Sequence, residues 1–142
     1  DGVLIGANLT ATHSRAAIER RDAAGVMRSR DIALPNASER SANLMLGYET
    51  AAWNARIAAN YKSRYLLQIG DTGDARRDAY VDAQTQWDLS ASVRLSKQMQ
   101  LVLEGLNLSD EPYYVYLGDR SRNYQYEQYG RTWKIGLKFA MN

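Results

Sequence analysis

Hydrophobic and polar residues alternate along the last stretch of the chain, from Gly130 to Asn142. The side chains of an extended strand point to opposite faces with a period of two residues, so one face here is apolar and the other is polar or small. The apolar positions are Trp133, Ile135, Leu137, Phe139 and Met141. The polar or small positions are Thr132, Lys134, Gly136, Lys138 and Ala140. Two lysines are difficult to bury in a soluble sheet, whereas an apolar face toward lipid and a polar face toward a wet lumen are typical of an outer-membrane barrel strand.

The same alternation predicts five more strands earlier in the chain. They cover residues 2–14, 40–49, 53–65 and 80–95, with a fifth strand that starts near residue 99. The third strand has an alternative interpretation, because Trp53, Ile57 and Tyr61 also follow a helical spacing and the alanines between them favour a helix. Its neighbours on both sides are predicted strands, and one of them is joined to it by a tight link. We therefore expect a strand here.

The fifth strand changes phase along its length. Leu101 and Leu103 share one face, whereas Leu106 and Leu108 share the other. An extra residue that bulges out of a strand resets its phase, and glycine is common at such positions. The sequence therefore predicts a bulge near Gly105.

The predicted links alternate between long and short. Long, polar links lie near residues 15–38, 67–79 and 117–124, and the first of them is long enough to contain local structure of its own. Short links lie near residues 49–51 and 96–98. The chain is thus predicted to form three hairpins in series. Long loops on one side and tight turns on the other are typical of outer-membrane barrels, with the long loops outside the cell.

Charge and strand length also bear on the membrane interpretation. No Asp, Glu, Lys or Arg lies on the predicted apolar faces, although a half-buried soluble sheet would show the same exclusion. From Trp53 to Tyr65 a strand extends about 40 Å, or roughly 30 Å across a membrane at a tilt of ~40°. These two aromatic residues would bracket an apolar band of about 25 Å. Most soluble strands are shorter, so strand length favours the membrane.

Composition excludes several functions. The chain has 142 residues, a net charge of +2 and no cysteine, so nucleic-acid binding has little support and thiol chemistry is excluded. Ten Tyr and three Trp against one Phe suit a boundary between apolar and wet surroundings. No apolar run is long enough for a transmembrane helix. The chain starts at Asp1, and six strands are too few to close a membrane barrel, so we expect a piece of a larger barrel.

Four segments resemble the C-terminal strands of TonB-dependent outer-membrane receptors, in the order that the family has them. These segments are Asn60–Tyr65, Trp87–Ser92, Leu103–Tyr113 and Tyr129–Thr132. The resemblance implies that residues 1–142 are an all-β segment of about six strands from a 22-stranded barrel, without its plug domain. It also implies a C-terminal assembly signal formed by Lys134, Gly136, Phe139 and Met141. The chain departs from that signal in ending at Asn142 and not at an aromatic residue.

The resemblance also implies a function. Such receptors reside in the bacterial outer membrane and actively take up a scarce ligand such as a ferric siderophore, haem, cobalamin or an oligosaccharide. The implied partners are outer-membrane lipid and lipopolysaccharide, the rest of the barrel and its plug, the TonB–ExbB–ExbD complex and the barrel-assembly machinery. No catalysis and no cofactor are implied. The alternatives are a soluble antiparallel β-sheet domain that binds a ligand or partner, and a passive outer-membrane pore.

Candidate site residues fall into two groups. Four residues near a loop tip have side chains suited to anionic or sugar ligands, namely Arg120, Arg122, Tyr124 and Tyr126. Six residues are expected to face the lumen, namely Arg56, Asn60, Arg64, Gln86, Asp88 and Lys134. For both groups the alternative is an ordinary hydrated surface. The lone His13 is expected to be a surface residue and not a metal ligand, and we expect the aspartates at positions 71, 74 and 78 only to solubilise their loop. No constellation of catalytic residues is present.

Overall fold

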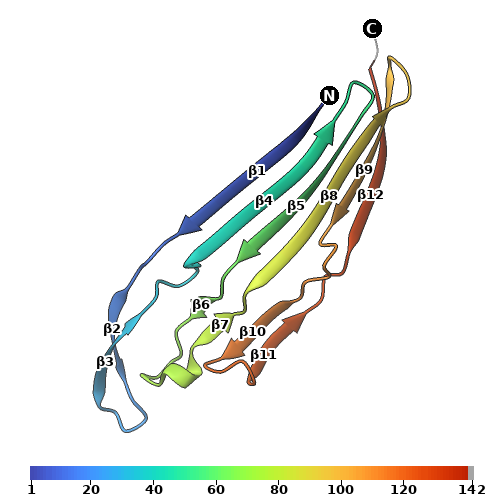
Figure 1. Cartoon of the computed structure of the whole chain (residues 1–142). Coiled ribbons are helices and arrows are strands. Elements are labelled where there is room, and N and C mark those ends of the chain that lie inside the picture. The colour runs from blue at the N-terminus through green and yellow to red at the C-terminus, as the bar shows by residue number, and fades with distance from the viewer. Residues whose placement is uncertain (141–142) are drawn as a thin grey trace.

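Six long strands form one antiparallel sheet in the computed structural model, which describes residues 1–140 (Figure 1). The strands are β1 (Gly2–Ala11), β4 (Arg40–Glu49), β5 (Trp53–Lys62), β8 (Gln84–Arg94), β9 (Met99–Leu106) and β12 (Thr132–Phe139). They pair in the order β1-β4-β5-β8-β9-β12, which is also their order along the chain. The strands β1 and β12 are therefore the edges of the sheet. The predicted fold class of three antiparallel hairpins is thereby confirmed. We call this assembly the long sheet.

The two ends of the long sheet differ. Short turns close the links between β4 and β5 and between β8 and β9, where Thr50 and Leu95 donate backbone hydrogen bonds to Trp53 and Met99. These turns lie at the same end as the start of β1 (Figure 1). The long links extend from the opposite end and contain further strands. No helix in the described residues is long and apolar enough to cross a membrane.

A second sheet continues the long sheet beyond its loop end. It consists of β6 (Tyr65–Gln68), β7 (Ala79–Val81), β10 (Tyr113–Leu117) and β11 (Asn123–Glu127), in the order β11-β10-β7-β6. We call it the extension. The third predicted strand, over residues 53–65, is therefore interrupted after Lys62 and resumes as β6. Pairing nevertheless keeps one register from Trp53↔Val93 to Leu66↔Tyr80, so each face of the long sheet continues onto the same face of the extension.

The predicted bulge near Gly105 is wrong. The strand β9 pairs with β8 and β12 without a register shift through Gly105. Gly105 is required for a different reason: a Cβ there would lie 2.8 Å from the Trp133 ring and 2.9 Å from Leu108. The irregularity begins two residues later at Asn107, whose φ of 53° is in the left-handed region. The strand then resumes as β10.

The segment that joins β9 to β10 is two residues longer than each of the two segments beside it, which join β7 to β8 and β11 to β12. Eight positions separate Val81 from Leu89, whereas ten separate their partners Val115 and Gly105. The same excess of two appears against β11 and β12. Because two is an even number, side chains keep their faces across the interruption.

Asn107 organises this interruption. Its backbone N–H donates to Asp88 Oδ1 (3.0 Å), and its side-chain Oδ1 accepts from the Glu111 N–H (2.9 Å). Its Nδ2 donates to the carbonyl oxygens of Glu111 (3.2 Å) and Gly130 (3.3 Å). One amide side chain therefore ties β9, β10 and the link before β12 together.

Replacing Asn107 by alanine is expected to destabilise the folded protein by about 2 kcal/mol, because partly buried backbone groups lose their partners and alanine disfavours a positive φ. The urea midpoint of the full-length protein in detergent micelles would measure the loss. Asn8→Ala is a matched control, because within residues 1–140 the Asn8 side chain forms one hydrogen bond, which it accepts from its neighbour Thr10. An unchanged midpoint for Asn107→Ala would contradict the assigned role.

The first long link contains a hairpin of its own, formed by β2 (Ala16–Arg21) and β3 (Met27–Ile32). It lies beside the turn that joins β6 to β7, which includes the short 3₁₀ helix η1 (Ala75–Arg77) (Figure 1). The Gly73 N–H donates to the Arg21 carbonyl oxygen at 3.0 Å. Behind the hairpin, the Asn36 N–H donates to the Leu66 carbonyl oxygen at 2.7 Å. The hairpin is thus attached to the extension.

The buried core lies outside the long sheet. All the buried hydrophobic residues that the structure describes belong to β3 or the extension, namely Ile32, Leu66, Ala79, Val81, Val115 and Tyr116. A cluster of Ala79, Val81 and Val115 is covered by side chains of the same sheet. The long sheet has no apolar layer packed on it within residues 1–140.

Candidate functional site

The two faces of the long sheet differ in chemistry. One face, here called the apolar face, exposes large hydrophobic side chains over its whole width. Ile5 on β1 and Ile135 on β12 are 74% and 76% exposed, and Ile57 at the centre of the sheet is 38% exposed. Burying such residues contributes roughly 1.5–3 kcal/mol each. An apolar surface of this extent indicates a face that is normally covered by a partner or by lipid.

The opposite face, here called the polar face, carries five of the six residues that were expected to face a lumen. They are Arg56, Asn60, Gln86, Asp88 and Lys134, and the pairing register places all of them on this face. Polar links cross the strands on this face: for example, Asn60 Nδ2 donates to Asp88 Oδ2 (3.1 Å), and Lys134 lies 3.9 Å from Glu104. The sixth residue, Arg64, lies beyond β5 at the start of the extension.

Aromatic residues mark both ends of the apolar face. The rings of Tyr48 and Trp53 lie 5.4 Å apart at the short-turn end. Tyr61, Trp87 and Trp133 lie toward the loop end. From Trp53 to Tyr61 a strand extends about 26 Å, or roughly 20 Å across a membrane at a tilt of ~40°, so these two residues lie just inside the limits of an apolar band of about 25 Å. Tyr65, which the sequence suggested as the upper limit, packs instead against the core of the extension.

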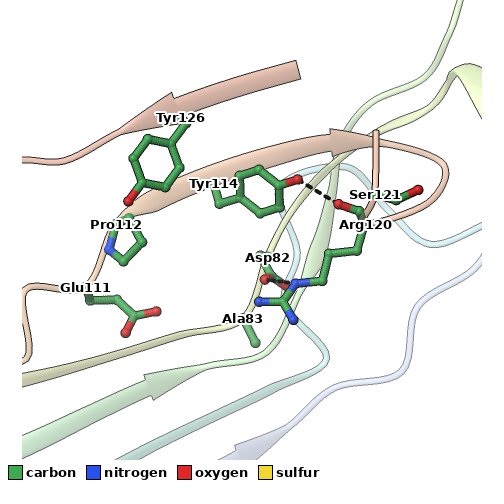
Figure 2. Close-up of a pocket in the computed structure, with 8 residues that line it drawn as sticks. All are labelled: Asp82, Ala83, Glu111, Pro112, Tyr114, Arg120, Ser121 and Tyr126. Atoms are coloured by element: carbon green, nitrogen blue, oxygen red, sulfur yellow. Dashed lines mark hydrogen bonds and ion pairs between the residues drawn. The ribbon is translucent and has the colours of Figure 1, made fainter. Parts of the chain in front are cut away.

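An open pocket of about 650 Å³ lies where the extension meets the long sheet (Figure 2). It is lined by Asp82, Ala83, Glu111, Pro112, Tyr114, Arg120, Ser121 and Tyr126. The constant register of the β5–β6 and β7–β8 hairpin places Asp82 on the continuation of the polar face. This pocket therefore opens on the polar side of the sheet.

Two interactions shape the pocket. Arg120 Nε lies 2.7 Å from Asp82 Oδ2, and the Tyr114 hydroxyl donates to the Arg120 carbonyl oxygen at 2.6 Å (Figure 2). The Tyr126 ring stands edge-on to Tyr114, with ring centroids 6.2 Å apart. The turn that follows β10 is thus held against the link between β7 and β8.

The row of tyrosines continues behind the pocket. Tyr114 contacts Tyr116, and Tyr116 stacks on Tyr80 with centroids 5.8 Å apart. The Arg64 guanidinium lies 5.8 Å from the centroid of the Tyr80 ring. Burial, followed by the nearby Asp78 carboxylate, raises the pKa of the Tyr80 hydroxyl, so this hydroxyl stays neutral. The row of rings thus extends from the pocket along the extension to Arg64.

The four predicted loop residues are divided between two pockets. Arg120 and Tyr126 line the pocket described above, whereas Arg122 and Tyr124 line a second pocket of about 510 Å³ beside Leu117. The division follows from a register shift in the β10–β11 pair: Val115 faces Gln125 but Tyr116 faces Asn123. Tyr124 is the extra residue and leaves the face of Tyr126. Sequence spacing alone places both tyrosines on one face.

The prediction that Asp78 serves only to solubilise its loop is wrong. Its side chain is fully buried, and Oδ1 accepts from Arg30 Nη2 (2.7 Å) and from the Gly70 N–H (3.0 Å). Its backbone N–H donates to the Ala75 carbonyl oxygen, and its own carbonyl oxygen accepts from the Gly118 N–H. Asp78 therefore joins all three long links. The sequence feature that could have indicated a buried role is the position of Asp78 directly before the apolar strand β7.

The other singled-out residues lie on the surface. Asp71 and Asp74 hold exposed arginines at 3.6 Å and 3.0 Å, and His13 lies on the exposed link between β1 and β2. Within residues 1–140, no group of three or more His, Asp or Glu side chains is placed to hold a metal ion. Of the expected assembly signal, Lys134, Gly136 and Phe139 lie on the edge strand β12, and Met141 lies outside the described residues.

Comparison with known proteins gives one match. A family model described as "TonB dependent receptor-like, beta-barrel" matches residues 3–108, which extend from β1 to the start of the Asn107 turn. Searches of curated proteins and of solved structures returned no match.

Proposed function

The chain belongs to the TonB-dependent receptor β-barrel family, and from this premise we propose that it forms the C-terminal part of the barrel wall of a receptor that takes up a scarce ligand. Members of this family are outer-membrane receptors and transporters and not enzymes. The proposal adds to this the position of the chain within the barrel and the orientation of its faces. Ferric siderophores, haem, cobalamin and oligosaccharides are the ligand classes to be tested.

The contrast between the two faces of the long sheet carries the proposal. A barrel strand presents alternate residues to lipid and to the lumen. The apolar face is exposed and carries a single charged residue, Arg40 at the loop end of β4, whereas the polar face carries Asn60–Asp88 and Lys134–Glu104 pairs. We therefore assign the apolar face to lipid. The polar face lines the lumen, where Arg56, Asn60, Gln86, Asp88 and Lys134 can contact the plug, and Arg64 lies above them at the start of the extension.

The edges and the loops define the remaining partners. Backbone groups at the free edges of β1 and β12 have no water to bind in lipid, so the rest of the barrel must pair with them. The residues of β12 present the assembly signal to the barrel-assembly machinery. The extension projects from the loop end and therefore faces the cell exterior, next to lipopolysaccharide. TonB–ExbB–ExbD acts through the N-terminal part of the full receptor.

Cysteine labelling in intact cells tests the orientation. The chain contains no cysteine, so single substitutions at Ala58 and Ile57 report neighbouring positions on opposite faces. We expect a water-soluble maleimide to react with Ala58→Cys in the full-length receptor and to react at least tenfold more slowly with Ile57→Cys, because the latter faces lipid. A fluorophore at Ile57→Cys should be quenched by nitroxide-labelled lipid. The reverse pattern, or equal labelling, would overturn the assignment.

Dependence on TonB separates an active receptor from a passive pore. We expect uptake by cells that produce the full-length receptor to stop when TonB is deleted. Uptake that continues without TonB, together with swelling of liposomes that contain the protein, would instead support the pore.

A further inference from the structure

We propose that the pocket lined by Glu111, Tyr114 and Tyr126 is a subsite for a cationic group of the ligand, such as an amine, a quaternary ammonium or a guanidinium. This inference rests on the proposed function, because it assigns the chemistry of a site that the receptor presents to the cell exterior. It is carried by three observations: the balance of charges in the pocket, the position of its aromatic rings, and the way in which Glu111 is held.

The charges that line the pocket favour a cation. Two carboxylates, Asp82 and Glu111, and one guanidinium, Arg120, line it. Arg120 is already paired with Asp82 at 2.7 Å, so these two charges offset each other. Glu111 forms no ion pair with any residue in the described part of the chain, which leaves one uncompensated negative charge. An anionic ligand would meet this charge without a free cation to compensate it.

Arg64, which the register places opposite Asp82, is directed elsewhere. Arg64 follows β5 in the hairpin whose other strand contains Asp82. Its guanidinium lies over the Tyr80 ring, and the residue lines a different pocket. It therefore does not occupy the space in front of Glu111.

The tyrosine rings supply the second element of a cation site. Tyr126 is 55% exposed, and Tyr114 stands beside it in the edge-on arrangement described above. The face of an aromatic ring attracts a cation, and the attraction adds to that of a nearby carboxylate. Glu111 and both rings line the same pocket, and Figure 2 shows Pro112 between Glu111 and Tyr126. A cationic group placed here would contact the rings while it remains close to Glu111.

The third element is the rigidity of the backbone around Glu111. Its N–H donates to the Asn107 side chain and its carbonyl oxygen accepts from it. Pro112 follows directly and restricts the chain further. Because these contacts use the backbone alone, replacing the Glu111 carboxylate by an amide leaves the position of residue 111 intact. A variant can thus remove the charge without disturbing the pocket.

A set of three probes of similar shape and different charge tests the proposal. Choline is cationic, 3,3-dimethylbutan-1-ol is its neutral isostere, and 3,3-dimethylbutyrate is anionic. Binding of each to the full-length receptor in detergent micelles would be measured by saturation-transfer NMR and tyrosine fluorescence. We expect choline to bind about tenfold more tightly than the alcohol, and the anion to bind most weakly.

Variants locate the effect in this pocket. Glu111→Gln is expected to weaken choline binding about fivefold and to leave binding of the alcohol unchanged, because only the charge is lost. Tyr126→Leu should weaken choline binding, whereas Tyr126→Phe, which keeps the ring, should retain it. Glu19→Gln, the same chemical change on the exposed strand β2, is the matched control and should have no effect.

Three results would overturn the subsite: equal binding of the three probes, choline binding that Glu111→Gln leaves unchanged, or tighter binding of the anion. Each of these failures leaves the proposed function standing if cysteine labelling still shows the apolar face in lipid and uptake still requires TonB. Failure of the labelling experiment, in contrast, would remove the proposed function itself.

Discussion

Replacing Asp78 by alanine is expected to release the β2–β3 hairpin from the extension and to lower the free energy of opening of this region by about 3 kcal/mol. Removing one member of a buried ion pair costs roughly 3–5 kcal/mol, because the other charge is left unpaired. Arg30 keeps 19% of its side-chain surface exposed and can turn partly to water, which favours the lower end of this range. The Gly70 N–H also loses its acceptor.

Hydrogen exchange of the full-length receptor in detergent micelles would measure this change. Amides of the β2–β3 hairpin and of β7 should exchange on the order of a hundredfold faster in Asp78→Ala, whereas amides of β5 and β8 should not change. Asp71→Ala is the matched control, since Asp71 is 81% exposed and such pairs contribute about 0–1 kcal/mol. Replacing both partners, as in Arg30→Met with Asp78→Leu, should recover part of the protection. Unchanged exchange in Asp78→Ala would show that the pair does not hold the hairpin.

The second large effect is expected at the centre of the apolar face. Replacing Ile57 by lysine should lower the stability of the full-length receptor in lipid vesicles by about 2–4 kcal/mol, because a charge would lie near the middle of the bilayer. Ile57 lies midway between Trp53 and Tyr61, the aromatic residues that limit the apolar band on β5. Unfolding in urea, followed by the loss of the heat-resistant band on electrophoresis, would give the difference.

Ala58→Lys is the matched control for this experiment. Ala58 is the next residue on the same strand, lies on the polar face and pairs with Asp88 across to β8. A lysine at this position meets water and a carboxylate, so its effect on stability should stay within about 0.5 kcal/mol. If Ala58→Lys destabilised the receptor more than Ile57→Lys, the assignment of the two faces would be reversed.

Alternation along the sequence was sufficient to predict the long sheet. A strand that separates lipid from water needs a strict period of two, so each residue of β5 reports its own face. The helical alternative for this segment fails because β4 and β8 pair with it on both sides. The alternation of long and short links then grouped the predicted strands into three consecutive hairpins. These features are local, and the sequence displays them directly.

The extension was harder to predict because its contacts are remote in sequence. The ion pairs Arg30–Asp78 and Asp82–Arg120 each join residues from different links of the chain. No local sequence pattern predicts either pair. Asn107 was visible only as part of the resemblance to a family. Its role in joining three segments depends on a positive φ that the sequence does not reveal. The candidate pocket was therefore found only in the structure, although the sequence had already indicated two of its residues, Arg120 and Tyr126, as ligand-binding candidates.

The two additional residues between β9 and β10 limit how such a receptor can diversify. Deleting or duplicating a single codon in this interruption would rotate β10 by half a period and exchange its two faces. Tyr114 would then point to the outside of the barrel and the apolar Val115 to its interior. We expect length variation here to be tolerated in pairs of residues, whereas the exposed tip of the β2–β3 hairpin, around residues 23–25, should accept odd and even insertions alike. In the proposed orientation of the receptor, an epitope tag or a reporter peptide for display on the cell surface would be inserted at that tip.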